Sequence, residues 1–334
     1  MAKFADAMIH WQKQHGRHDL PWQNTSDPYA IWVSEIMLQQ TQVAAVIGYY
    51  AKFMQRFPTI DALANASQED VLQSWSGLGY YSRARNLHNA AQKIVDDFSG
   101  VFPQDFDDIL SLSGIGRSTA AAISTFALNA PQPILDGNVK RVFARHFNIA
   151  GWPSAPKIEQ KMWQIAMREN PANEAIAYTQ GLMDLGATLC TRTKPNCPAC
   201  PVNTSCQALV KNIVSTLPTP KPRKVIPEKS TTMLVYMNGD EVMLEKRPPV
   251  GIWGGLWSFP EVDELIAESP LSKLTHTFTH FKLHITPQLI YTNSAHSQVN
   301  EAGKIWLSID DAIGAAIPTP IRKILLQLKA LKLA

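Results

Sequence analysis

The chain gathers its metal-binding groups in one place. Its only four cysteines, Cys190, Cys197, Cys200 and Cys206, fall within seventeen consecutive residues. Four thiolates can hold either a tetrahedral zinc ion or an iron-sulfur cluster. Structural zinc sites usually use two C-x2-C pairs, whereas here only Cys197 and Cys200 form such a pair. The spacing therefore favours iron-sulfur over zinc. A disulfide framework is disfavoured, because a chain of 334 residues can bury a core without cross-links.

A second chemically capable group is a carboxyl in an apolar setting. Glu35 stands between Ser34 and the apolar run 36–38. Burial there would raise its pKa and let it donate a proton near neutral pH. Apolar residues recur every three or four positions from Val33 to Met54, which predicts a helical core stripe with Gln40 at a position expected to be apolar. A solvated helix face is the alternative interpretation of Glu35.

A third candidate is Asp136, which the apolar pair Ile134 and Leu135 delivers to the expected start of a helix. Either Asp136 or Asn138 could simply cap that helix. Alternatively, Asp136 faces a cation that develops during a reaction, with Glu35 across from it. Glycosidic bond cleavage uses such a pair, because one carboxylic acid protonates the leaving group and one carboxylate stabilises an oxocarbenium-like sugar.

Two glycine turns suggest contact with phosphate. Gly114 and Gly116 follow one expected helix and open the next, which is expected to begin near Ser118. Backbone amides that converge at a helix start bind phosphate. The turn 77–79 precedes groups suited to base stacking and phosphate contact, namely Tyr80, Tyr81, Arg83 and Arg85. Each turn alone could be an ordinary tight turn, but together with the cysteines they support a DNA-binding hypothesis.

Helices are expected to position these groups. Residues 1–212 show apolar spacing typical of helices and no alternation typical of strands. Residues 213–229 contain a proline-rich, basic segment and are expected to form an extended linker. Residues 230–334 are expected to form an α+β domain. The predicted fold is a mainly α domain followed by a smaller α+β domain.

The second domain mixes strand and helix patterns. Asn238 and Gly239, between two strand-like runs, predict a β-hairpin. The expected strands are 231–236, 241–246, 283–291 and 304–307, and the expected helices are 310–317 and 321–331.

The composition fits a cytoplasmic enzyme. With 45% apolar residues the chain can form two cores, and no apolar run approaches the roughly 20 residues that span a bilayer. We therefore expect no membrane partner. The net charge is only +3, but residues 187–229 hold one acid, Glu228, against seven bases: Arg192, Lys194, Lys211, Lys221, Arg223, Lys224 and Lys229. Such a local basic stripe favours a partner that carries phosphate.

Together these segments resemble the MutY family of adenine DNA glycosylases, within the endonuclease III or helix-hairpin-helix superfamily. The resemblance rests on residues 33–43, 77–86, 112–119 and 135–142 and on the cysteine pattern, and it covers nearly the whole chain. It implies a monofunctional enzyme of base excision repair that hydrolyses the N-glycosidic bond of adenine paired with 8-oxoguanine or guanine in double-stranded DNA. The target base would be flipped out of the duplex. It also implies a monomer at the bacterial nucleoid, with other repair proteins as partners.

The resemblance assigns roles to the candidate residues. Glu35 would protonate N7 of adenine, and Asp136 would stabilise or transiently trap the sugar cation, with Asn138 organising the site. The four cysteines would hold one four-iron, four-sulfur (4Fe-4S) cluster. The cluster would be structural and would present the basic loop around Arg192 and Lys194 to DNA.

Further residues would surround the target base. Trp22 and Leu38 would line the adenine pocket. Gln40 and Tyr80 would fill the space around the lesion and stack in the duplex, which would account for a glutamine in an apolar stripe.

The hairpin separates the closest alternatives. The amides of Gly114 and Gly116 would bind phosphate downstream of the flipped nucleotide. In bifunctional members of the superfamily, the residue two positions after the last glycine is a lysine that forms a Schiff base and cleaves the strand, but here it is Ser118. Lys140 lies close to Asp136 in sequence and could supply adventitious Schiff-base chemistry. The alternatives are a bifunctional glycosylase and lyase, or a non-catalytic iron-sulfur or zinc protein that binds mismatches.

The second domain resembles the Nudix fold. Nudix hydrolases bind metal through an R-E-x-x-E-E helix, and the acids after Pro260 do not form that motif, so hydrolysis is not expected: Glu261, Asp263, Glu264 and Glu268. In the family this domain reads 8-oxoguanine through a Phe-Ser-His loop, which here is Phe278, Thr279 and His280. The alternating polar positions 276, 280 and 284 also fit one half-buried strand.

Overall fold

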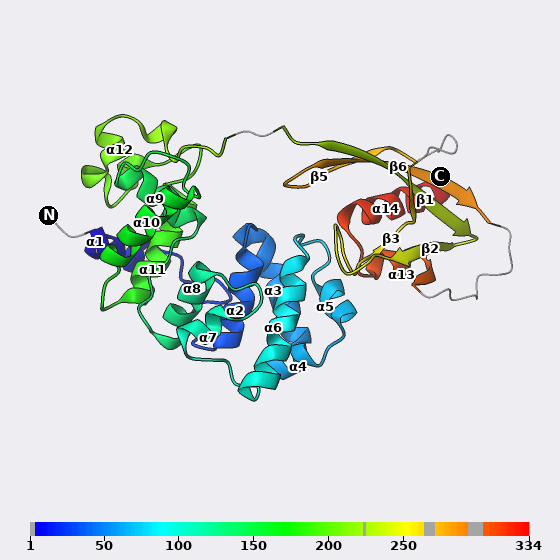
Figure 1. Cartoon of the computed structure of the whole chain (residues 1–334), viewed down its shortest axis with the longest axis horizontal. Coiled ribbons are helices and arrows are strands. Elements are labelled where there is room, and N and C mark those ends of the chain that lie inside the picture. Colours follow the sequence, from blue (N-terminus) through cyan, green and yellow to red (C-terminus); the bar gives the residue numbers. More distant parts are fainter. Residues whose placement is uncertain (1–3, 223–224, 264–270, 293–302, 334) are drawn as a thin grey trace. The chain divides into compact units, whose positions relative to one another are not determined.

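The computed structural model describes residues 4–222, 225–263, 271–292 and 303–333 (Figure 1). The chain forms two compact units. The first contains Met1–Asp61 with Asn89–Arg223, and the second contains Ala62–His88 with Lys224–Ala334. Four residues singled out from the sequence lie outside the described ranges: Arg223, Lys224, Glu264 and Glu268.

The described residues of the first unit form helices joined by turns and loops, with no strands. Its helices are α1 (Phe4–His15), α2 (Pro28–Leu38), α3 (Val43–Arg56), α7 (Phe106–Leu110), α8 (Arg117–Leu128), α9 (Gly137–His146), α10 (Pro156–Glu169), α11 (Ala175–Asp184) and α12 (Gln207–Val210). Two further helices, α4 (Ile60–Ala64) and α6 (Ser82–Phe98), contain residues of both units. The prediction of a helical domain without strands is confirmed.

The core of this unit forms where α1, α8, α9, α10 and α11 bury their apolar faces. On α9, Val139, Val142 and Phe143 recur at helical spacing and are all buried. The ring of Phe143 packs edge-on against Phe4 of α1, with centroids 6.1 Å apart. Tyr178 of α11 packs against the same Phe4 ring. This core therefore fixes α9, whose first residue follows Asp136.

The prediction of one apolar helical stripe from Val33 to Met54 is wrong in two respects: the stripe is interrupted, and Ile47 within it is 40% exposed. Helix α2 ends at Leu38, and α3 begins only at Val43. Gln40 between them has a φ of 57°, in the left-handed region, which interrupts a right-handed helix. Gln40 is exposed and does not occupy an apolar position of a continuous stripe.

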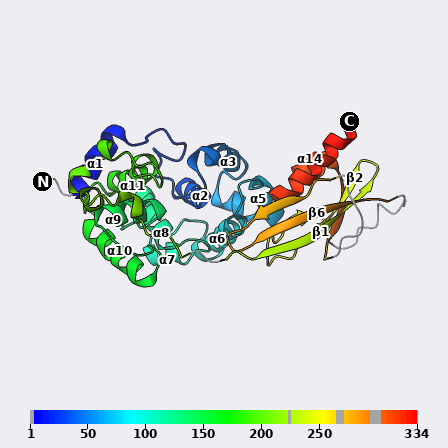
Figure 2. The same cartoon turned by 90° about the horizontal axis from the view of Figure 1, so that it is seen from above.

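The second unit contains a mixed β-sheet (Figure 2). Its described strands are β1 (Glu228–Asn238), β2 (Glu241–Lys246), β3 (Trp257–Ser258), β4 (Glu261–Val262), β5 (Leu274–Thr277), β6 (Lys282–Tyr291) and β7 (Lys304–Ser308). The order is β3-β2-β1-β6-β5, with β4 beside β1 and β7 beside β2. Strands β1 and β6 are parallel, and the other pairs are antiparallel.

The expected strands and helices of this unit are present with shifted ends. Asn238 pairs with Glu241 across the predicted hairpin. The helices are α13 (Ile309–Gly314) and α14 (Thr319–Leu333). The short strands β3, β4 and β5 were not predicted, because two to four residues carry too little alternation to be recognised.

The histidines expected on one strand are divided between two. His276 lies on β5 and His284 on β6, while His280 lies in the turn that joins them.

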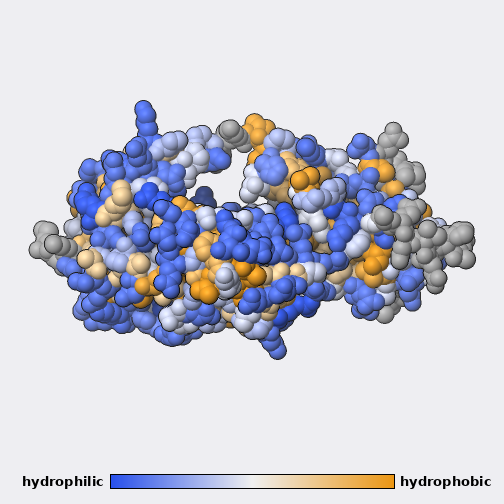
Figure 3. All heavy atoms as spheres, turned by 60° about the horizontal axis from the view of Figure 1, so that its bottom comes forward, coloured by the Kyte–Doolittle hydropathy of each residue, from blue (hydrophilic) through white to orange (hydrophobic). Residues whose placement is uncertain are grey.

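None of the described helices is long and apolar enough to cross a membrane. The face in Figure 3 is mostly hydrophilic, with hydrophobic side chains in small groups.

Candidate active site and cysteine loop

A cavity of about 1220 Å³ in the first unit collects most of the predicted site. Its walls come from the segment after α1 and from α2, α8, α9 and α11. Eight of the residues singled out from the sequence line it: Trp22, Glu35, Leu38, Gln40, Gly116, Ser118, Asp136 and Asn138. The structure thus brings together side chains that are a hundred residues apart in sequence.

Glu35 enters the cavity from the last turns of α2. The start of that helix is stabilised by capping. The Asp27 side chain accepts a hydrogen bond from the Tyr29 amide at 3.0 Å, and Pro28 occupies the first turn. The neighbours of Glu35 on the helix, Val33 and Ile36, are buried, and Glu35 itself is half-buried where it meets the cavity. Burial, with a smaller contribution from the nearby charge of Asp136, raises the pKa of Glu35 to about 7. Glu35 is therefore protonated in much of the protein near neutral pH.

Asp136 caps α9 and also lines the cavity. Its Oδ1 accepts a hydrogen bond from the Val139 amide at 2.7 Å, so the capping interpretation is confirmed. Its Oδ2 accepts one from Asn138 Nδ2 at 3.3 Å. Burial raises the pKa of Asp136, although these hydrogen bonds and the Arg141 charge oppose the rise. Capping does not exclude chemistry here, because the same carboxyl shares the cavity with Glu35.

The hairpin before α8 and the first turn of α8 form hydrogen bonds with the segments that carry the two carboxyls. Gly114 has a φ of 81°, which glycine adopts without strain, and Gly116 precedes the first residue of α8. Gln39, at the end of the Glu35 helix, donates to the Gly114 carbonyl at 3.4 Å. The Ser118 hydroxyl accepts a hydrogen bond from the Leu135 amide at 3.2 Å, which holds the residue before Asp136.

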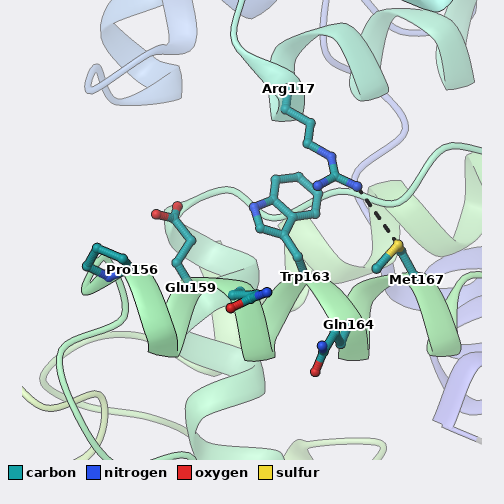
Figure 4. A pocket seen from close by; sticks show the side chains of 7 residues that line it. Arg117, Pro156, Glu159, Trp163, Gln164 and Met167 are labelled. Atoms are coloured by element: carbon teal, nitrogen blue, oxygen red, sulfur yellow. Dashed lines mark hydrogen bonds between the residues drawn. The ribbon is translucent and has the colours of Figure 1, made fainter.

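Lys140 has a partner outside the cavity lining. Its ammonium donates to Glu159 on α10 at 2.6 Å. Glu159 also borders a shallower hollow of about 520 Å³ (Figure 4). In that hollow the Arg117 guanidinium lies 4.0 Å from the centroid of the Trp163 ring. This stacking holds the first residue of α8 next to the hairpin.

A buried ion pair beside the cavity was not anticipated from the sequence. Asp184 is fully buried and accepts hydrogen bonds from the Arg17 side chain at 2.7 Å and from Gln180 at 2.9 Å. Arg17 and Gln180 both line the cavity. A buried carboxylate needs such partners, because an unpaired charge away from water is costly. Arg17 and Asp184 are 167 residues apart, so no local pattern marks the pair.

None of the four cysteines forms a disulfide, and each is partly buried. Burial, with smaller contributions from the other three cysteines, raises the pKa of Cys200 to about 11. The four thiols therefore lie close enough to interact electrically. Among the residues that the structure describes, no three metal-ligating side chains form a group that could hold a single metal ion.

Helix α9 joins the cavity to the cysteine loop through two arginines that the sequence did not single out. Arg141 donates to the Asn138 side chain at 2.8 Å and to the Cys190 carbonyl at 2.7 Å. One turn later, Arg145 Nη1 donates to Cys190 Sγ at 3.4 Å. Their spacing of four residues puts both on one face of α9, which is the signal that could have identified them.

The glycine turn at residues 77–79 lies in the second unit. Tyr80, which follows it, is 47% exposed and has a φ of 49°. In the structure, the guanidinium groups of Arg83 and Arg85, which were expected to contact phosphate, donate to backbone carbonyls. Arg83 is buried, stacks on Trp75 and donates to the Gly79 carbonyl at 3.1 Å. Arg85 donates to the Gly254 carbonyl at 2.8 Å.

The Phe278–Thr279–His280 segment forms the tight turn between β5 and β6. The Phe278 amide donates to the Phe281 carbonyl at 2.8 Å, which closes the turn. The Phe278 ring packs between Trp253 and Phe281, with centroids 5.4 and 4.6 Å away. Thr279 and His280 are exposed beside this aromatic platform.

Comparison with known proteins agrees with this architecture. Residues 33–168 match the HhH-GPD superfamily of base excision DNA repair proteins, and residues 231–327 match the NUDIX domain. A solved thermostable thymine-DNA glycosylase shares 26% identity and a TM-score of 0.56, covering 62% of this chain and 95% of that one. An endonuclease III solved in a non-covalent DNA complex, 23% identical with a TM-score of 0.52, shares the fold over 63% of this chain and 94% of its own. The chain is therefore a helix-hairpin-helix DNA N-glycosylase of base excision repair with a Nudix-like domain.

Full-length relatives identify the family within this class. A protein of Buchnera aphidicola subsp. Acyrthosiphon pisum named adenine DNA glycosylase is 37% identical, covering 96% of both chains. Proteins of the same name from Mus musculus and Homo sapiens are each 33% identical over 96% of this chain, covering 77% and 73% of their own. The chain belongs to the adenine DNA glycosylase family. The family resemblance drawn from the sequence and the predicted fold class are thus confirmed.

Gly186 offers a test of the site geometry. A methyl group added at this position would lie 2.6 Å from Asn138 Cβ, so Asn138 would have to move. We expect Gly186→Ala to slow single-turnover base release by about tenfold or more, because small displacements at a site cost large factors in rate. The matched control is Gly48→Ala, where an added methyl meets no atom within 4 Å. Equal rates for both variants and the wild type would show that Asn138 does not hold the site.

Proposed function

We propose that the enzyme removes adenine paired with 8-oxoguanine or guanine in double-stranded DNA by hydrolysing the N-glycosidic bond, without cleaving the strand. The observation that carries this proposal is the pair of carboxyls in one cavity, of which Glu35 has a pKa of about 7. Such a pair supplies an acid for the leaving base and a negative charge for the sugar cation. The family names of the full-length relatives support adenine as the base.

In this mechanism Glu35 protonates N7 of the flipped adenine, which makes the base a better leaving group. The C–N bond breaks, and adenine leaves as the sugar becomes positively charged. Asp136 stabilises that cation, and water then adds and passes its proton to a cavity carboxylate, which gives the abasic site. Asn138 supports Asp136 through its 3.3 Å hydrogen bond. Trp22, whose ring packs against Tyr50, and Leu38 provide the apolar walls that receive the base.

The DNA duplex meets the protein through its turns. Gly114 and Gly116 bind backbone phosphate with their amides, and the base leaves the stack as in other enzymes that act on bases. Gln40 and Tyr80 enter the duplex around the mispair. Both are exposed at turns and held in the left-handed conformation, which suits a side chain that must project beyond the surface.

Two features favour a monofunctional enzyme over a bifunctional glycosylase and lyase. Ser118 stands where the lyases carry a lysine, and its hydroxyl is engaged with the Leu135 backbone. Lys140 is paired with Glu159 at 2.6 Å and does not line the cavity that holds the two carboxyls. The presence of both cavity carboxyls favours catalysis over simple mismatch binding.

The second domain reads the opposite base in this proposal. Residues 230–334, beyond the linker 213–229, present Phe278, Thr279 and His280 to 8-oxoguanine. Phe278 packs on the aromatic platform, while the polar groups of Thr279 and His280 face solvent. We further propose that the protein acts as a monomer in the cytoplasm at the nucleoid, together with other repair proteins.

The cysteine loop fits one 4Fe-4S cluster. Its donors are four thiols and no other ligating group, and Arg145 supplies an N–H to one of the sulfurs, as is common around such clusters. The cluster, once bound, would hold the basic loop of Arg192 and Lys194 in place for DNA.

The central test is Glu35→Gln, which removes the acid at nearly constant volume. We expect single-turnover release of adenine opposite 8-oxoguanine to fall by about 10² to 10⁴, with duplex affinity unchanged. In the wild type the rate should fall as pH rises above about 7, where Glu35 loses its proton. Glu169→Gln, the same change at the end of α10, should leave the rate unaltered. Near-wild-type release by Glu35→Gln would refute the assignment.

The same variant tests the Glu35 pKa through stability. The folded pKa of Glu35, about 7, lies above its unfolded value of about 4.3. The contribution of this carboxyl to the free energy of unfolding is therefore fully present below pH 4 and is lost as pH rises to 7. The free energy of unfolding of Glu35→Gln, relative to that of the wild type, should therefore increase by on the order of 1–3 kcal/mol between pH 4 and pH 8. Denaturant unfolding at both pH values would measure this gain, and a constant difference would contradict the raised pKa.

Anaerobically purified protein should contain iron and acid-labile sulfide in equal amounts, with the visible absorption of a cubane cluster. Metal analysis would detect the alternative, because one equivalent of zinc and no sulfide would identify a zinc site. Cys200→Ser should weaken folding or DNA binding before it changes the chemical step.

Thr279→Ala tests the lesion-reading turn. We expect it to narrow the preference for adenine opposite 8-oxoguanine over adenine opposite guanine by only about two- to tenfold, since one hydrogen bond is typically worth ~0.5–1.5 kcal/mol. Single-turnover rates on both duplexes give the ratio, and Thr277→Ala on the preceding strand is the matched control. If Phe278→Ala, Thr279→Ala and His280→Ala all keep the wild-type ratio, the second domain does not read the lesion.

A further inference from the structure

Tyr81 is a buried tyrosine whose hydroxyl joins two distant segments of the second unit. It is 8% exposed and immediately follows the exposed Tyr80. Its hydroxyl accepts a hydrogen bond from the Gly77 amide at 3.2 Å, on the glycine turn. The same hydroxyl donates to the Ile317 carbonyl at 3.2 Å, in the loop between α13 and α14. One oxygen atom therefore connects the start of the glycine turn to the Nudix-like domain.

The last residue of α13 and the loop after it offer two carbonyl groups to this part of the chain. Ser76 donates to the Ile317 carbonyl at 3.1 Å and receives a hydrogen bond from Arg322 of α14 at 3.0 Å. On α5 (Gln68–Ser74), Gln73 donates to the Gly314 carbonyl at 2.9 Å. Ile317 is fully buried. These hydrogen bonds and the burial of Ile317 hold the loop in place, so it can fix the position of the glycine turn.

The other end of the glycine turn is held from within. The Gly79 carbonyl accepts hydrogen bonds from Trp75 Nε1 at 3.2 Å and from Arg83 at 3.1 Å. The Arg83 guanidinium also lies 5.5 Å from the Tyr80 ring centroid. Gly77 and Gly79 have φ values of 99° and 77°, and Tyr80 has 49°. With both ends of the turn fixed, the direction of the Tyr80 side chain is set by the Tyr81 anchor on one side and by Trp75 and Arg83 on the other.

We propose that Tyr81 is a positioning residue through which the Nudix-like domain sets the pose of Tyr80. The domain then contributes to adenine release opposite plain guanine as well as opposite 8-oxoguanine. This inference rests on the proposed function, in which Tyr80 enters the duplex. Tyr81 itself is buried and acts through its neighbour.

The experiment compares Tyr81→Phe, Tyr80→Ala and the double variant in the full-length protein. Two signals are measured on a duplex with adenine opposite guanine. One is single-turnover adenine release, and the other is the fluorescence rise of 2-aminopurine placed beside the mispair, which reports unstacking and needs no bond cleavage. The matched control is Gln73→Ala, which removes a hydrogen bond between the same segments without touching the turn.

We expect Tyr81→Phe to reduce the fluorescence rise at least twofold and the release rate about fivefold, as for loss of one or two hydrogen bonds. In the Tyr80→Ala background, Tyr81→Phe should add nothing, because it acts through the missing ring. Gln73→Ala should match the wild type. If Tyr81→Phe is too unstable to assay, Ser76→Ala replaces it, with a smaller expected reduction in the fluorescence rise and in the release rate.

Three results would overturn the inference. They are an unchanged fluorescence rise in Tyr81→Phe, effects of Tyr81→Phe and Tyr80→Ala that multiply, and an equal loss in Gln73→Ala. Wild-type protein that unstacks 2-aminopurine but releases no adenine would instead contradict the proposed function, and the fluorescence comparison would still decide the role of Tyr81.

Discussion

The capping bond at the start of α9 is the interaction on which the site depends. Asp136 accepts the Val139 amide at 2.7 Å, so the carboxylate is fixed where the positive end of the helix dipole favours its charge. Burial works in the opposite direction on the same group. Glu35 shares the cavity, and burial together with the charge of Asp136 raises its pKa to about 7, so Glu35 holds a proton in much of the protein near neutral pH.

Helix α9 carries that constraint away from the cavity. Arg141 links Asn138 to the backbone of Cys190, and Arg145 reaches the sulfur of the same residue. The helix is itself held by the aromatic core around Phe4 and Phe143. Disorder in the cysteine loop would therefore reach Asp136 through a chain of hydrogen bonds and a rigid helix, even though no cysteine lines the cavity.

Much of this arrangement was predictable from sequence, where the signals are local. The cysteine spacing, the hairpin glycines, the Asn238 turn and the helical spacing of residues 1–212 each depend on neighbours within a few positions. The rest depends on distant contacts. Arg83 and Arg85 have the composition of a phosphate site, yet tertiary packing turns both toward carbonyl groups. The Arg17 and Asp184 pair and the break at Gln40 are likewise set by packing and backbone conformation, which residue types do not specify.

The left-handed backbone at Gln40 and Tyr80 has a consequence for protein engineering. A non-glycine residue in this region costs roughly 1 kcal/mol or more, and glycine at either position would relieve that strain. A search for more heat-resistant variants would therefore tend to replace the two side chains that project from these turns. Selection for thermal stability would favour glycine at these two positions, whereas selection for DNA repair would favour keeping Gln40 and Tyr80.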